Sequence, residues 1–165
     1  MATGTVILPV VGASFPATNP AALSFSSARG KLLFDDTIDE SCLWTFRMPA
    51  NYASAPVLKV QFSMASDHDP AHKVEFEGSI MAVTPQDAQN MDADSYDTVN
   101  RGNTTINDDL GYMEEVSITL TNADSVAAGD FVSLKLARDA DATGENDNAT
   151  GDAEVWAVSL EYTTS

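Results

Sequence analysis

The chain has 165 residues and a formal net charge of −17, from 25 acidic and eight basic side chains. This length predicts one domain with enough buried apolar surface to fold without disulfides or metals. The charge argues against DNA, RNA or an anionic membrane as a partner, because each of these requires a basic protein face, and no segment contains the run of about 20 apolar residues that spans a bilayer.

The first 30 residues combine one short strand pattern with a longer irregular segment. Residues 5–8 favour a β-strand that Pro9 ends. Residues 12–30 are rich in Gly, Ser, Ala, Pro and Asn, and they predict an extended arm that must lie on another surface. We expect the arm to pack on a sheet edge or a neighbouring subunit through its isolated apolar side chains. These side chains are Val6, Leu8, Phe15, Leu23 and Phe25.

The remaining chain alternates apolar and polar residues, which predicts strands. The segments are 31–34, 41–48, 57–64, 73–83, 116–120, 131–138 and 153–163. Gly78 occupies an inward position and indicates a bulge or a close approach of another backbone. Residues 85–90 are the only helical candidate, and residues 95–100 predict a short edge strand. The sequence therefore predicts an all-β fold, an antiparallel two-sheet β-sandwich that is most simply a jelly roll.

The expected organisation is a single domain, with an N-terminal strand and extended arm over residues 1–30 and the β-sandwich over residues 31–165. The N-terminus lacks the basic segment that precedes the apolar run of a signal peptide. We therefore expect the chain to stay in the cytoplasm in which it is made.

Histidine and cysteine give little support for a metal or nucleophile site. His68 and His72 have helical spacing, but Pro70 between them disfavours a helix and no cysteine is near. We interpret them as solvated loop residues. The single cysteine, Cys42, lies in an apolar run and is interpreted as a buried, inert thiol.

Adjacent carboxylates occur at residues 35–36, 108–109 and 114–115. A glycosidase pair must face each other across a cleft, whereas neighbouring strand residues point to opposite faces. The sequence also lacks a nucleophile elbow, a phosphate loop and a dinucleotide fingerprint. We predict that the protein is not an enzyme, with no catalytic, cofactor-binding or metal-ligating residues and no cofactor.

Two binding hypotheses stay open. Residues 139–145 begin like a calcium loop, but Thr150 stands where a bidentate Glu is needed, so an acidic hairpin loop over residues 139–152 is favoured. Trp44, Trp156, Tyr52 and Tyr112 could form a sugar-stacking platform. The alternation places Trp44 on an inward face and groups Trp156 with Val158 and Leu160, which favours core positions for both tryptophans.

Several blocks of sequence carry a resemblance to a known group of proteins. They are residues 34–40 (FDDTIDE), 44–49 (WTFRMP), 114–120 (EEVSITL), 128–132 (AGDFV), 138–139 (RD), 150–154 (TGDAE) and 160–164 (LEYTT). Together they resemble small virion-associated proteins of tailed bacteriophages that look like jelly-roll head decoration (cement) proteins.

The resemblance implies a structural virion protein on the capsid exterior, typically a homotrimer, that binds the major capsid protein and stabilises the head. The alternative is a carbohydrate-binding or adhesin-like β-sandwich module of a phage tail or fibre.

Overall fold

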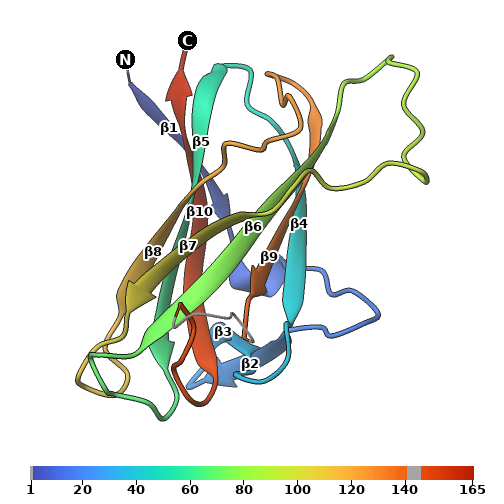
Figure 1. Ribbon diagram of the computed structural model, residues 1–165. Coiled ribbons are helices and arrows are strands. Elements are labelled where there is room, and N and C mark those ends of the chain that lie inside the picture. The colour runs from blue at the N-terminus through green and yellow to red at the C-terminus, as the bar shows by residue number, and fades with distance from the viewer. Residues whose placement is uncertain (1, 141–145) are drawn as a thin grey trace.

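The computed structural model describes residues 2–140 and 146–165, which form two antiparallel β-sheets packed face to face (Figure 1). Sheet A contains β1 (Thr3–Leu8), β2 (Ala22–Ser26), β3 (Arg29–Phe34), β5 (Tyr52–Met64), β8 (Glu114–Thr119) and β10 (Ala153–Thr164). Sheet B contains β4 (Ser41–Arg47), β6 (Lys73–Val83), β7 (Asn100–Thr105) and β9 (Phe131–Arg138). A short 3₁₀ helix, η1 (Val10–Gly12), follows β1.

The strand order defines the topology. Sheet A runs β2-β3-β10-β5-β8, with β1 also paired to β10, and sheet B runs β4-β9-β6-β7. Without β1 and β2, the two four-stranded sheets β3-β10-β5-β8 and β4-β9-β6-β7 have the arrangement of a jelly roll. The predicted all-β, antiparallel, jelly-roll-like sandwich is therefore confirmed. Among the described residues, no helix is long and apolar enough to cross a membrane.

The core lies between the sheets and comes from alternate strand positions, as the period of two predicts. Phe76 of β6 packs edge-on against Phe34 and Phe62 of sheet A, with ring centroids 5.7 and 5.5 Å apart. All three rings are fully buried, and each such side chain contributes roughly 1.5–3 kcal/mol through removal from water.

Gly78 marks a close approach of the two sheets rather than a bulge, because β6 keeps its register with β9 through this position. A Cβ atom on Gly78 would lie 3.0 Å from Leu120 Cδ2 and 3.1 Å from Leu58 Cδ2. Only glycine fits here without displacing its neighbours.

Residues 2–30 lie against the sandwich of their own chain. β1 pairs with β10 over six residues, and Leu8 belongs to the buried core. Val6 is partly buried against that core, whereas Phe15, Leu23 and Phe25 stay 39%, 38% and 59% exposed. Two of the five apolar side chains expected to anchor the arm thus pack within the chain, and the other three remain exposed.

Three secondary-structure predictions are wrong. β2 forms within the segment that was predicted to be irregular, as one strand of a hairpin with β3. Residues 85–90 form turns rather than a helical turn, because Pro85 and the Asn and Asp side chains that follow favour local turns. The predicted edge strand at 95–100 lies further along, since β7 starts at Asn100.

Candidate functional site

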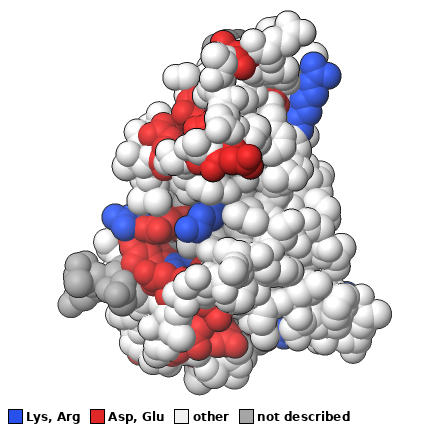
Figure 2. Space-filling view, turned by 90° about the vertical axis from the view of Figure 1, so that its right-hand side faces the viewer, with Lys and Arg blue, Asp and Glu red and all other residues white. Residues whose placement is uncertain are grey.

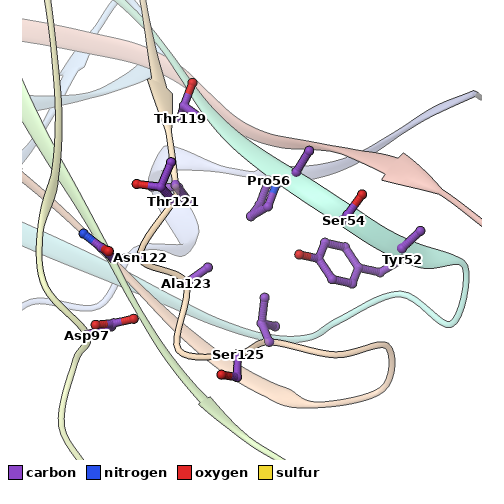
Figure 3. A pocket seen from close by; sticks show the side chains of 13 residues that line it. Tyr52, Ser54, Pro56, Asp97, Thr119, Thr121, Asn122, Ala123 and Ser125 are labelled. Carbon is purple, nitrogen blue, oxygen red and sulfur yellow. The ribbon is translucent and has the colours of Figure 1, made fainter.

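A pocket opens at the end of the sandwich that carries both chain termini (Figure 1). Its volume is about 650 Å³, within the range of small-molecule sites. One wall is the start of β5, and the opposite wall is the segment that leaves β8 toward β9 (Figure 3). The lining residues are Tyr52, Ala53, Ser54, Ala55, Pro56, Asp97, Thr119, Leu120, Thr121, Asn122, Ala123, Ser125 and Val126. We call this space the Tyr52 pocket.

Tyr52 is the central side chain of this pocket. It points from β5 into the space between the two walls (Figure 3), yet the residue as a whole is only 9% exposed. Its ring is held by Tyr162, at a centroid distance of 5.6 Å, and Tyr162 is fixed by a 2.9 Å hydrogen bond from its hydroxyl to Asn51 Oδ1. Burial raises the pKa of Tyr52, so its hydroxyl remains a proton donor.

Among residues 2–140 and 146–165, the structure gives the Tyr52 hydroxyl no hydrogen-bond partner. No fully buried side-chain polar atom in these residues lacks a partner, so this hydroxyl keeps accessible surface. A nearly buried tyrosine usually finds a partner for its hydroxyl. Here the hydroxyl faces a cavity that Ser54, Thr119 and Ser125 also line. The group is therefore positioned to bond something that enters the pocket.

The wall opposite Tyr52 is held in place by a buried amide. Asn100 of β7 donates from Nδ2 to the Asn122 carbonyl at 2.8 Å, and its Oδ1 accepts from the Asn122 backbone N–H at 2.9 Å. Asp97 Oδ2 accepts from the Asp124 N–H at 2.9 Å, and Asp124 in turn accepts from the Ala82 N–H at 2.7 Å. The wall is thus rigid before any ligand binds, which lowers the entropy cost of binding.

The backbone around the pocket is strained. Ala55, Asp124 and Ser125 have φ values of 54°, 50° and 53°, in the left-handed region that non-glycine residues rarely adopt. Such conformations cost about 1–3 kcal/mol each and concentrate at ligand sites. Ala55 and Ser125 both line the pocket, so the strained positions coincide with it.

The four aromatic residues considered for a sugar platform do not share one surface. Trp44 is buried at 4% exposure and donates from Nε1 to the Pro9 carbonyl at 2.9 Å, as its inward position predicted. Tyr52 lies in the pocket, and Tyr112 is 61% exposed on the loop between β7 and β8.

The prediction of a core position for Trp156 is wrong. Val155 pairs with Phe62 and Ala157 pairs with the next residue, Gln61, so Trp156 is the extra residue of a β-bulge. The bulge reverses the alternation along β10. Trp156 consequently lies on the outer face of sheet A, where its Nε1 donates to Ser63 Oγ at 2.9 Å.

The histidine and cysteine predictions have mixed outcomes. Cys42 is fully buried, and its burial raises the pKa of the thiol strongly, which confirms the buried position. His68 is exposed. His72 is not simply solvated, since its Nδ1 lies 2.8 Å from Asp67 Oδ2. The described residues contain no group of three or more His, Cys, Asp or Glu side chains that could hold a metal.

The acidic loop over residues 139–152 lies partly outside the described residues, because the calcium-like segment includes 141–145. At its start, Asp139 pairs with Arg101 at 3.0 Å. At its end, the backbone N–H of Thr150 donates to Asp67 at 2.8 Å. Acidic side chains gather in a band on the face seen in Figure 2, with few basic side chains among them.

The adjacent carboxylates serve local structure instead of forming a facing pair. Asp35 accepts hydrogen bonds from the backbone N–H groups of Thr37 and Ile38 in a turn. Glu114 accepts from Asn107, while Glu115 accepts from Gln61.

Among the residues that the structure describes, Arg138 is the largest fully buried side chain, and the sequence did not indicate its role. It is fully buried and forms a bidentate pair with Asp147, at 2.9 and 2.8 Å. It also donates to the backbone carbonyls of Phe34, Ala149 and Gly151. Arg138 thereby joins the end of β3, the end of β9 and the segment before β10.

Comparison with known proteins gives no family model and no curated protein that matches this chain. Solved structures with related arrangements include a xylan-binding module CBM15 (11% identity, 99% of each chain, TM-score 0.49). The CBM22-2 xylan-binding domain from Paenibacillus barcinonensis Xyn10C matches with 14% identity, 92% of each chain and a TM-score of 0.47.

A glycosylation-associated protein complex (Gap123) from Streptococcus agalactiae matches with 9% identity and a TM-score of 0.48; the match covers 98% of this chain but only 26% of that one. At TM-scores below 0.5, these similarities carry no argument about function.

Proposed function

We propose that this chain is a non-catalytic β-sandwich that binds carbohydrate, and that the Tyr52 pocket holds the sugar. The observation that carries the proposal is the Tyr52 hydroxyl, which belongs to a largely buried residue, faces a cavity and is given no hydrogen-bond partner among the described residues. The proposal corresponds to the carbohydrate-binding alternative from the sequence.

The lining of the pocket supports an uncharged, hydroxyl-rich ligand. Serine, threonine and tyrosine residues line the pocket together with small apolar residues such as Pro56 and Ala123, and Asp97 is the one charged residue among its described lining. With a net charge of −17, the protein as a whole repels anions. A neutral sugar satisfies both conditions, because its hydroxyl groups donate and accept while its C–H faces contact apolar atoms.

The test is a glycan array followed by calorimetric titration of wild type and Tyr52→Phe. The substitution removes only the unpartnered hydroxyl, so the fold should be unchanged. Loss of one hydrogen bond of about 0.5–1.5 kcal/mol predicts a two- to tenfold weaker Kd. Tyr112→Phe, at an exposed tyrosine outside the pocket, is the matched control and should bind as wild type. The proposal fails if no neutral glycan binds or if Tyr52→Phe binds as tightly as wild type.

A second proposal is the structural virion role, in which the protein decorates a capsid exterior as a trimer bound to the major capsid protein. It is favoured by the apolar side chains that residues 2–30 leave exposed, of which Ile7 is 70% and Val11 is 58% accessible. Deleting residues 1–30 would remove β1 and part of the core, so Phe25→Ser is the better test. It should reduce occupancy on undecorated shells, and unchanged occupancy would remove this support.

A further inference from the structure

A second hollow lies on the outer face of sheet A, and it shares no lining residue with the Tyr52 pocket. It has a volume of about 530 Å³ and is lined by Arg29, Gly30, Gly111, Met113 and Trp156. We call it the Trp156 hollow. Its walls come from the turn between β2 and β3 and from the loop between β7 and β8.

The Trp156 hollow is lined by a partly buried tryptophan and bordered by exposed apolar side chains. Trp156 forms part of it because of the bulge in β10, and Met113 beside it is 52% exposed. A Cβ atom on Gly30 would lie 2.7 Å from Val11 Cγ1 and 3.6 Å from Phe25 Cε1. Val11 and Phe25, both more than half exposed, therefore border the wall directly. Exposed Met and Phe side chains beside an Arg and a partly buried Trp are typical of protein interfaces.

The charges on the two walls are opposite. Arg29 is exposed on one side and forms no ion pair within the described residues. Asp108 and Asp109 are exposed on the loop that forms the other wall, and the structure pairs neither carboxylate with a base among residues 2–140 and 146–165. Lys31, whose Nζ lies 5.2 Å from the centroid of the Trp156 ring, is already paired with Glu154.

We propose that the Trp156 hollow is a self-complementary interface through which two copies of this chain pair about a two-fold axis. In a two-fold pair, the same patch of each copy faces the other. Rotation about an axis through the hollow brings the Arg29 wall of one copy toward the β7–β8 loop of the second, so that Arg29 faces Asp108 and Asp109, and Phe25 faces Met113. The pairing places apolar surface against apolar surface and opposite charges together, although the molecule is strongly negative overall. This inference is independent of sugar binding, and it is an alternative to the trimeric virion role.

The test is sedimentation equilibrium of the full-length protein without sugar, across a series of protein concentrations. The mass is expected to rise from one chain to two. Arg29→Glu places like charges across the axis and should weaken the dimer about tenfold. Asp109→Arg should weaken it to a similar degree, whereas the double variant Arg29→Glu/Asp109→Arg should regain affinity because each reversed charge again meets an opposite one. Lys135→Glu, on sheet B, is the matched control for the change in net charge.

A monomer at every concentration overturns the proposal, as does a mass of three chains. A dimer that Arg29→Glu weakens no more than Lys135→Glu also overturns it. Tyr52→Phe should leave the dimer unchanged, so the outcome here and the outcome for sugar binding can be told apart.

Discussion

Replacing Asp147 by alanine should destabilise the fold severely. The carboxylate accepts two hydrogen bonds from Arg138, at 2.9 and 2.8 Å, and one from the Glu75 backbone N–H at 3.1 Å. Arg138 has no exposed side-chain surface, so the variant leaves a guanidinium charge buried without its partner. Breaking a buried pair in this way costs about 3–5 kcal/mol, which is a large share of the roughly 5–15 kcal/mol that stabilises a domain.

The assay is urea unfolding followed by tryptophan fluorescence, with Asp92→Ala at an exposed loop position as the control. The control should change the free energy of unfolding by less than about 0.5 kcal/mol. Arg138→Met should also be strongly destabilising, because it leaves the Asp147 carboxylate and the backbone carbonyls of Phe34, Ala149 and Gly151 without their hydrogen-bond donor. A loss below about 1 kcal/mol in Asp147→Ala would refute the view that this pair joins the strand ends.

Three further predictions concern titration and packing. Burial alone would raise the pKa of Asp67, but the N–H groups of Asp69 and Thr150 and the contact with His72 lower it to about 2 from 3.8. Because the pKa of this carboxyl is lower in the folded state, the ionised carboxylate stabilises the fold at pH values above its pKa in the unfolded chain. The difference in Tm between wild type and Asp67→Asn should therefore be full above about pH 4 and vanish as the pH falls toward 2. An equal difference at every pH contradicts this. Gly78→Ala should cost about 1–3 kcal/mol in urea unfolding by overpacking, and an unchanged midpoint would argue against the close approach of the sheets. Cys42 should react with a thiol reagent only after unfolding, and rapid labelling of the native protein would be inconsistent with its burial.

The period of two predicted most of the fold because both sheets bury one face and expose the other. Leu58, Val60 and Phe62 of β5 are fully buried, and only a strand places every second residue inward. The pattern fails where burial is weak. The prediction for β7 was wrong because the inward positions of this strand include Gly102. A Cβ atom added there would lie 2.9 Å from the Ser117 carbonyl oxygen, so no large apolar residue can mark the inward face.

Trp156 shows why a local pattern cannot place every side chain. One extra residue in β10 reverses the alternation, and nothing in the sequence around it distinguishes a bulge from a regular strand. The Tyr52 pocket was missed for a different reason. The sequence indicates Tyr52 only as a stacking residue. The cavity that its hydroxyl faces is also lined by Asp97 and Ser125, which long-range strand pairing brings beside it.

The most direct test of sugar binding at the Tyr52 pocket is a nuclear magnetic resonance titration of isotope-labelled protein with neutral oligosaccharides, reading the backbone amide shifts. We predict that at least one oligosaccharide shifts the amides of Tyr52, Ser54 and residues 119–126, with little change around Trp156. The absence of any shift, or shifts confined to the Trp156 hollow, would contradict the account.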